Sequence, residues 1–284
     1  MSASASVVAS LAELTVVVPA RNAGALLDDC LASVVSAGPR EVIVVDGRST
    51  DDTVEVARRH GATLLSDDGT GLPRARLIGV EAASTPWVAL VDADVVLPDG
   101  ALEQLLREFV AGDFAALQAG LRSEGGPGYW GRALADHHRS GRSKDWFGLV
   151  ATIFHRDTLL EHGFDPNFLS GEDIELRWRL ERAGARIGVS RRTVVRHRFQ
   201  SDTFAFARSQ WLADGHGLGR MIAKHRWSGA WLAVLPAAAG LRGAVLAVGR
   251  LQPRWVPYYL GFATYNYVGM ARQLRERPVR AGRR

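Results

Sequence analysis

The amino-acid sequence predicts an α/β fold with a mostly parallel wound sheet, followed by a helical C-terminal region. Three observations support this. Short apolar runs rich in Val, Ile and Leu alternate with helix-like segments of about 10 to 15 residues, a pattern typical of a parallel sheet with helices on both faces. The 284 residues are 47% hydrophobic, which suits a large domain with an appendage. Residues 220–284 carry 12 Arg or Lys and one acid; their net charge of +11 leaves −6 for the rest of a chain whose total is +5.

The first part of the chain supplies the alternating elements in order. Strands are predicted at 14–20, 41–47, 62–66 and 87–94, and helices at 24–38, 49–61, 72–83 and 98–112. In the first helix, Leu27, Leu31 and Val34 share one face and Gly38 is a C-cap candidate. In the second helix, Ser49 or Thr50 is expected to be the N-cap.

Carboxylates follow two of the predicted strands. Asp46 ends the second strand, and Asp92 and Asp94 end "WVALVDAD". Ligands of wound parallel sheets bind beyond the carboxyl ends of the strands, so we expect all three side chains to face the same crevice. A D-x-D pair supplies the oxygen ligands that Mg²⁺ and Mn²⁺ prefer. The alternative is a pair of ordinary turn acids, since Asp99 shows that this loop is polar.

The ordered set "VVVPARNAG", "VIVVDGRSTDDT", "RARLIGV" and "VALVDAD" resembles the nucleotide-sugar-binding half of the family 2 glycosyltransferases, which have the A-type glycosyltransferase fold. The resemblance runs from about residue 14 to about residue 200 and implies an inverting enzyme. By this resemblance, the donor is contacted by Pro19, Ala20, Arg21 and Asn22, by Asp46 at the base, and by Arg76 and Asp92. "DGRSTDDT" departs from the commonest family form at Gly47 and Arg48, which leaves the base undecided; UDP is favoured on family frequency.

The resemblance also assigns catalytic and metal-binding roles. In "SGEDIELRWRLERAG", Asp173 matches the family's catalytic base and Glu172 the residue that positions the base or the acceptor. In "VVRHRF", His197 matches a histidine that joins Asp94 as a ligand of Mn²⁺ or Mg²⁺. From the residues alone, Glu172 and Asp173 are equally well explained as first-turn acids of an amphipathic helix whose apolar side holds Ile174, Trp178 and Leu180. Likewise, a lone histidine is commonly a structural polar residue, and Arg76 is equally well explained as a solvated helix arginine.

The implied reaction is the transfer of a single sugar from a nucleoside-diphosphate sugar to an acceptor hydroxyl or phosphate. No Q-x-x-R-W motif of processive members follows the acidic motif. Between the two motif sets, Trp146 and Phe147 are either acceptor-stacking rings or core residues. The resemblance and the strand pattern divide the chain into a disordered leader (1–12), a nucleotide-sugar-binding half (13–118), an acceptor-binding and catalytic half (119–205) and a basic helical region (206–284).

The C-terminal region suggests a second role. Residues 229–249 are long and apolar enough to be considered as a membrane span, although Pro236 and Arg242 count against one. Tryptophans flank this stretch and arginines end the chain, a pattern suited to the surface of an anionic membrane. We therefore weigh peripheral membrane association through residues 220–284, with a lipid-linked acceptor, against a pair of packed helices with a solvated tail and a soluble acceptor.

Other classes of protein fit less well. "VVVPARNAGALL" lacks both the Gly-rich basic loop of nucleotidyltransferases and the G-x-G-x-x-G of dinucleotide-dependent dehydrogenases. A non-catalytic nucleotide-sugar-binding module would not need Asp94, Asp173 and His197. No nucleic-acid partner is expected. One cysteine, Cys30, excludes an intrachain disulfide, and the N-terminus has no basic start typical of a signal peptide, so a cytoplasmic location is expected, at the inner face of the membrane if the tail binds lipid.

Overall fold

The protein, seen in a computed structural model, is described over residues 9–139 and 147–276. The chain divides into two compact units. The first comprises Met1–Glu124, His138–Asn167 and Asp173–Gln200, and the second comprises Gly125–His137, Phe168–Glu172 and Ser201–Arg284. The two halves expected at 13–118 and 119–205 therefore fall largely within one unit. Ordered structure also begins before residue 13, because Leu11–Glu13 forms a 3-10 turn (η1) in which the Ala12 N–H donates to Ser10 Oγ at 3.2 Å.

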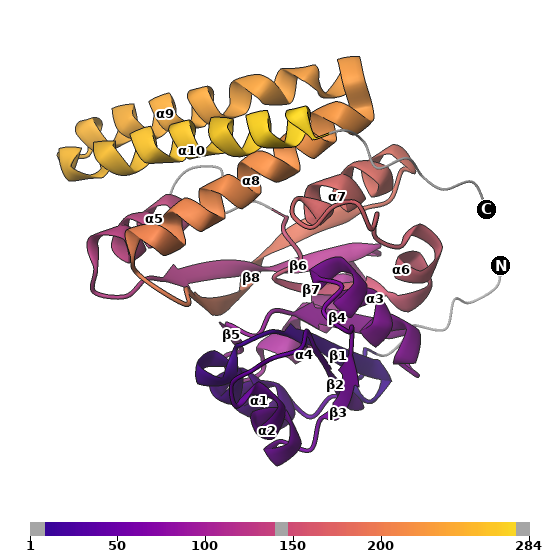
Figure 1. Ribbon diagram of the computed structural model, residues 1–284. Helices are drawn as coiled ribbons and strands as arrows, with labels where there is room; N and C mark the ends of the chain where they lie inside the picture. Colours follow the sequence, from indigo (N-terminus) through magenta and orange to yellow (C-terminus); the bar gives the residue numbers. More distant parts are fainter. Residues whose placement is uncertain (1–8, 140–146, 277–284) are drawn as a thin grey trace. The chain divides into compact units, whose positions relative to one another are not determined.

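The first unit is built on a sheet with the strand order β3-β2-β1-β4-β7-β6-β8-β5 (Figure 1). The strands are β1 (Leu14–Ala20), β2 (Glu41–Asp46), β3 (Thr63–Ser66), β4 (Trp87–Val91), β5 (Val95–Val96), β6 (Ala116–Glu124), β7 (Ala151–His155) and β8 (Ile187–Arg198). Strands β3, β2, β1 and β4 are parallel neighbours, as the strand–helix alternation predicts. The sheet as a whole is mixed, because β7 pairs antiparallel with β4 and β6, and β5 pairs antiparallel with β8. The α/β class is confirmed.

Helices cover both faces of this sheet (Figure 1). They are α1 (Gly24–Ala37), α2 (Thr53–Arg59), α3 (Leu72–Ala82), α4 (Ala101–Ala111), α6 (Arg156–His162) and α7 (Glu172–Arg182). Alternate residues of β1 point to opposite faces. Val16 and Val18 join a cluster with α1, α2 and α4, whereas Val17 joins a second cluster with α3, α6 and α7. Two apolar layers thus hold the strand ends in fixed positions.

The predicted details of α1 are confirmed, and those of α2 are not. Leu27, Leu31 and Val34 are fully buried, and Gly38 ends α1 with a left-handed φ of 74°. Helix α2 begins at Thr53 rather than near residue 49, and its preceding residue makes no side-chain cap bond. Ser49 and Thr50 are instead bonded to the loop after β1, as described below.

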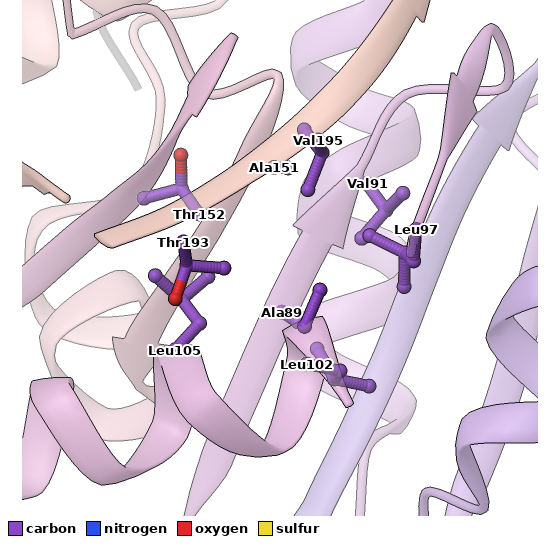
Figure 2. Close-up of a pocket in the computed structure, with 10 residues that line it drawn as sticks. Ala89, Val91, Leu97, Leu102, Leu105, Ala151, Thr152, Thr193 and Val195 are labelled. Atoms are coloured by element: carbon purple, nitrogen blue, oxygen red, sulfur yellow. The ribbon is translucent and has the colours of Figure 1, made fainter. Parts of the chain in front are cut away.

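A small pocket lies between α4 and the sheet, and Figure 2 shows its lining. Leu97, Leu102, Leu105 and Val195 line it together with Thr152 and Thr193. Most of these side chains belong to the first hydrophobic cluster, and none is a predicted site residue. We interpret it as a packing void and not as the substrate site.

The second unit is helical. It contains α8 (Phe204–His225), η3 (Arg226–Val234), α9 (Leu235–Gly249), η4 (Pro253–Trp255), α10 (Val256–Arg275) and most of α5 (Tyr129–Arg139). Helices α8 and α10 approach closely because glycines line their contact: a Cβ on Gly215 would overlap the Asn266 backbone, and one on Gly219 would come within 2.9 Å of the Gln273 side chain. The predicted helical C-terminal region is thus confirmed.

A half-buried histidine lies among aromatic rings of this unit. The His137 ring lies 5.3 to 5.7 Å from the rings of Tyr258, Tyr259 and Phe262, measured between centroids. Burial lowers the pKa of His137 to about 4, and the Arg242 charge adds to this effect. The folded unit therefore holds His137 in its neutral form.

This pKa predicts a pH dependence of stability. The folded pKa of His137 lies below the unfolded value, so its contribution is complete above about pH 6.5 and is lost as the pH falls toward 4. The loss amounts to about 3 kcal/mol by pH 4. Urea unfolding of the wild type and of His137→Gln at pH 7 and pH 4 measures this loss. Between these pH values, the free energy of unfolding should fall by about 3 kcal/mol more in the wild type than in the variant. An equal loss in both proteins would contradict a neutral His137.

Candidate active site

The loop after β1 is tied to the loop after β2. Asn22 has a left-handed φ of 49°, its N–H donates to Ser49 Oγ at 2.9 Å, and its side-chain oxygen accepts from the Thr50 N–H at 2.8 Å. The Ser49 N–H also donates to both carboxylate oxygens of Asp46 at 3.2 Å. These bonds position Asn22 and Asp46 at the carboxyl edge of neighbouring parallel strands.

The same loop also caps α1. The Asp51 carboxylate accepts from the Gly24 N–H at 3.1 Å, and Thr53 Oγ1 accepts from the Ala23 N–H at 2.8 Å. A Cβ on Gly24 would clash with the exposed Asp52 carboxylate, so a larger residue here would displace that side chain. The "STDDT" run therefore serves the start of α1 as well as preceding α2.

The remaining members of the first motif divide into two groups. Pro19 and Ala20 are buried strand residues, so only their backbone is available to a donor. The Arg21 side chain is exposed and lies against Gly47, where an added Cβ would stand 3.1 Å from Arg21 Cβ. Gly47 thus leaves room for Arg21, whose side chain an added Cβ would have to shift by a few tenths of an ångström.

Arg76 and Asp92 form a part-buried ion pair, with Arg76 Nη2 2.9 Å from Asp92 Oδ1. The Arg76 side chain is 2% exposed, which rules out a solvated helix arginine and makes direct donor contact by its guanidinium the less favoured role. Burial raises the pKa of the Asp92 carboxyl to about 6, against the attraction of Arg76 and with a further increase from Asp94. The hydrogen bond and charge of Arg76 therefore orient the Asp92 carboxylate and favour its charged form.

Breaking this pair has a predictable cost. Arg76→Met should lower the free energy of unfolding by about 3 kcal/mol, because it leaves the Asp92 charge part-buried without its partner. Adding Asp92→Asn removes that charge and should restore a large part of the loss. Urea unfolding of both single variants and the double variant measures the coupling. Strictly additive losses would show that the pair contributes nothing as a pair.

Asp94 and His197, which lie far apart in the sequence, are adjacent in the fold. The antiparallel pairing of β5 and β8 sets His197 opposite Val95, and the Arg198 N–H donates to the Asp94 carbonyl at 3.0 Å. His197 Nε2 lies 3.3 Å from Asp94 Oδ2. Burial lowers the pKa of His197, but the hydrogen bond and charge of Asp94, aided by Asp92, outweigh it and raise that pKa above its usual value.

The Asp94–His197 pair fits a divalent cation. Asp94 Oδ1 is buried and has no hydrogen-bond partner among the described residues, so it is an acceptor without a donor. A carboxylate and an imidazole are suitable ligands for Mn²⁺. Within the described residues, no three His, Cys, Asp or Glu side chains are grouped to hold a metal. Such an ion would therefore take its further ligands from water and substrate oxygens, as Mg²⁺ commonly does.

Two neighbours of His197 give no signal in the sequence. Ser123 Oγ lies 3.3 Å from His197 Nδ1 and 3.4 Å from His138 Nδ1, and both histidine rings contact Phe199. If Nδ1 of His197 donates to Ser123, Nε2 is left bare for a metal. His138, which matched no motif, thus belongs to the surroundings of the site.

Helix α7 carries the two predicted catalytic acids in its first turn, where Asp173 is partly exposed and Glu172 is 6% exposed. The buried side of α7 is formed by Leu176 and Leu180, whereas the predicted Ile174 and Trp178 are only partly buried. Glu175, which the sequence did not single out, is fully buried and accepts from Arg179 Nε at 2.9 Å, and Arg179 also donates to the His162 and Gly163 carbonyls. This network fixes α7, and with it Asp173, to the end of α6.

Of the two predicted acceptor aromatics, Phe147 lies in the hydrophobic core. Phe147 is 2% exposed and packs edge-to-face with Phe154 in the second hydrophobic cluster. It is a core residue, and we withdraw it as an acceptor contact. Trp146 lies outside the described residues.

Comparison with known proteins decides the family. Residues 15–162 match the family described as Glycosyl transferase family 2. The chain belongs to this family. It is 43% identical over 99 residues to an uncharacterized glycosyltransferase of Mycobacterium tuberculosis, covering 35% of this chain and 44% of that protein. It is 38% identical over 104 residues to 4,4'-diaponeurosporenoate glycosyltransferase of Staphylococcus aureus, covering 34% of this chain and 28% of that protein. Less than half of each relative is therefore spanned.

Solved structures support the fold assignment of this family 2 chain. The mannosyltransferase PcManGT of Pyrobaculum calidifontis, solved with GDP-Man and Mn²⁺, superposes with a TM-score of 0.64 at 21% identity, covering 92% of this chain and 86% of that one. Glucosyl-3-phosphoglycerate synthase of Mycobacterium tuberculosis, solved with Mn²⁺, UDP-Glc and phosphoglyceric acid, gives 0.57 at 21% identity, covering 74% and 78%. Both likenesses establish the A-type fold.

Proposed function

We propose that the protein transfers a single sugar from a nucleoside-diphosphate sugar, with UDP-sugars favoured, to an acceptor hydroxyl or phosphate, with inversion of the anomeric centre. The observation that carries this proposal is the Asp94–His197 pair, which lies next to the Arg76–Asp92 ion pair. Among the described residues, the buried Asp94 Oδ1 has no hydrogen-bond partner. Mn²⁺ or Mg²⁺ bound there would neutralise the charge that develops on the departing diphosphate.

The chain's own residues take the remaining roles. Asp46, Asn22 and Arg21 hold the nucleotide at the edge of β1 and β2, and Asp92, oriented by Arg76, contacts the ribose or the donor sugar. Asp173 accepts the proton of the attacking acceptor hydroxyl, and Glu172 positions the base or the acceptor. The hydroxyl oxygen forms the new bond to the anomeric carbon as the bond to the diphosphate breaks. A single displacement of this kind inverts the centre.

A lipid-linked acceptor is the favoured one, met at the inner face of the cytoplasmic membrane, with peripheral association through residues 220–284. Two findings support it. The described part of this region is basic and exposes many large apolar side chains. One relative is named 4,4'-diaponeurosporenoate glycosyltransferase.

A soluble acceptor is the second candidate. It is favoured by the likeness to glucosyl-3-phosphoglycerate synthase, which was solved with a small phosphorylated acid. Such an acceptor would use Asp173 in the same way but would need no membrane contact.

One experiment tests the reaction and separates the acceptors. The protein is incubated with Mn²⁺ and radiolabelled UDP- or GDP-sugars. The acceptors are a bacterial lipid extract and, in parallel, a panel of soluble hydroxy acids and sugar phosphates. We expect label in the lipid phase, and the anomeric proton coupling in the NMR spectrum of the product should show inversion. Label only in soluble products would favour the second candidate. Neither transfer nor donor hydrolysis with any donor would contradict the proposed enzyme.

A further inference from the structure

Helix α9 of the second unit buries small residues and exposes large apolar ones, the reverse of a surface helix in a water-soluble protein. Its buried residues are mostly small: Pro236, Gly240, Gly243 and Ala247. Gly240 and Gly243 let the helix lie directly on α10, because added Cβ atoms would meet Ala263 and the Tyr259 ring. Large aliphatic side chains of α9 point outward: Leu241, Val245 and Val248 are 55 to 69% exposed, and Val234, the last residue of η3, is 63% exposed.

Helix α10 also exposes large apolar side chains, although its buried face holds large residues such as Tyr258, Tyr259 and Met270. Leu260, Tyr267 and Leu274 are exposed and recur every seven residues, so they form one stripe along the helix. The Tyr267 hydroxyl donates to the Ala233 carbonyl at 2.9 Å, which places this stripe next to the start of α9. Trp227 and Trp231 before α9 and Leu251 after it are exposed as well. Figure 1 shows α9 and α10 side by side as a hairpin.

The charges around the hairpin indicate what covers its apolar side chains. Among residues 220–276 the exposed cations are Lys224, Arg226, Arg242, Arg250, Arg254, Arg272 and Arg275, and the only acid is Glu276. A second copy of the chain would bring these like charges together. An anionic lipid surface complements them, and it also suits the exposed tryptophans, which favour the boundary between water and lipid.

Residues 204–249 are divided into α8, η3 and α9 and do not form one continuous α-helix. Within the described residues, one stretch, Phe204–Gly249, is long and apolar enough to span a membrane by length and composition alone. That stretch is interrupted by the 3-10 segment η3, where Arg226 has a left-handed φ of 49°. Its first helix, α8, buries Gly215 and Gly219 against α10. An apolar face on one side, with arginines at its margin, is typical of an interfacial helix.

We infer that the α9–α10 hairpin docks on an anionic bilayer through the outward side chains of Leu241, Val245, Val248 and Leu260, with the surrounding arginines on the headgroups. Embedding these side chains would remove from water the exposed apolar surface that a soluble monomer rarely carries. The inference rests on the proposed function only for its purpose, which is to bring the enzyme to a lipid-linked acceptor.

A fluorescent label tests the docking directly. The single native cysteine, Cys30, is fully buried, so Val248→Cys can be labelled selectively with an environment-sensitive dye. On adding vesicles with 30% phosphatidylglycerol or phosphatidylserine, we expect a blue shift and quenching by brominated acyl chains. The control is Val35→Cys on α1, an exposed valine in the first unit, which should show neither change.

Charge substitutions identify the docking face. The triple variant Leu241→Glu, Val245→Glu and Val248→Glu should lower the vesicle partition coefficient at least about tenfold, because each carboxylate would enter an apolar layer. The control, Val35→Glu with Leu160→Glu, adds carboxylates at exposed apolar sites of the first unit and should change it little. Arg250→Gln with Arg254→Gln should weaken binding about fivefold per residue removed, and less at high salt.

The outcomes are decisive and separate from the enzyme assay. The docking would be overturned if the triple variant bound vesicles as tightly as the wild type, or if the label at Val248→Cys stayed in water. Light scattering that shows a lipid-free dimer, broken by the triple variant, would assign the face to a second copy instead. Donor hydrolysis should be unchanged in the triple variant, so a failure of docking leaves the proposed chemistry standing, and loss of chemistry leaves docking measurable.

Discussion

Replacing Asp173 with asparagine is expected to reduce turnover by roughly 10² to 10⁴-fold, because the amide keeps the shape of the side chain but cannot accept the acceptor's proton. The donor affinity should stay close to that of the wild type, since Asp173 lies on α7 and the proposed nucleotide contacts lie after β1 and β2. Steady-state rates and donor titrations measure the two effects separately.

A carboxylate at the far end of the same helix provides the control. Glu181 is exposed and bonded to Arg177, so Glu181→Gln should leave turnover within a factor of about two. Wild-type turnover in Asp173→Asn would reassign that residue to the start of α7, as a first-turn acid that interacts with the helix dipole.

Replacing Asp94 with alanine is expected to lower transfer at least about 100-fold, because it removes one of the two side chains proposed to hold the cation that stabilises the departing diphosphate. Chelation of the wild type should abolish transfer, and Mn²⁺ or Mg²⁺ should restore it. The Asp94 side chain is 29% exposed and contacts His197 through Oδ2, so the variant should lose that contact but remain folded by circular dichroism.

Asp99→Ala serves as its matched control, because Asp99 is an exposed acid five residues further along the same loop region. It should retain nearly full activity. Full activity of the wild type in excess chelator, or of Asp94→Ala in the presence of Mn²⁺, would remove the metal from the mechanism.

Much of the fold was predictable because local patterns determine it. β1 is an unbroken apolar run buried on both faces, and α1 shows its buried face and its glycine cap in the sequence. The start of α2 was predicted wrongly because Ser49, Thr50 and Asp51 are good cap residues whose bonds go to the loop after β1 and to α1, some 27 residues away. The reversed faces of α9 were hidden because hydrophobic periodicity does not tell which side of a helix meets the protein.

The candidate site was predictable where motif residues lie at strand ends and unpredictable where contacts are long-range. Asp94 and His197 were paired through the family resemblance, and the β5–β8 register places them together. The burial of Arg76 against Asp92 depends on how α3 packs, which one sequence does not reveal. Ser123 and His138 come close to His197 only through the tertiary fold. The sequence around Phe147 does not tell whether its ring is buried or exposed.

The most direct test of the central claim is a calorimetric titration of nucleoside diphosphates into the protein with and without Mn²⁺. We predict that one diphosphate, UDP in the first instance, binds with Mn²⁺ at least about tenfold more tightly than without it, and that Asp94→Ala removes this gain. Binding that is equal with and without Mn²⁺, or a metal-dependent gain that survives in Asp94→Ala, would contradict a metal-assisted glycosyltransferase centred on Asp94 and His197.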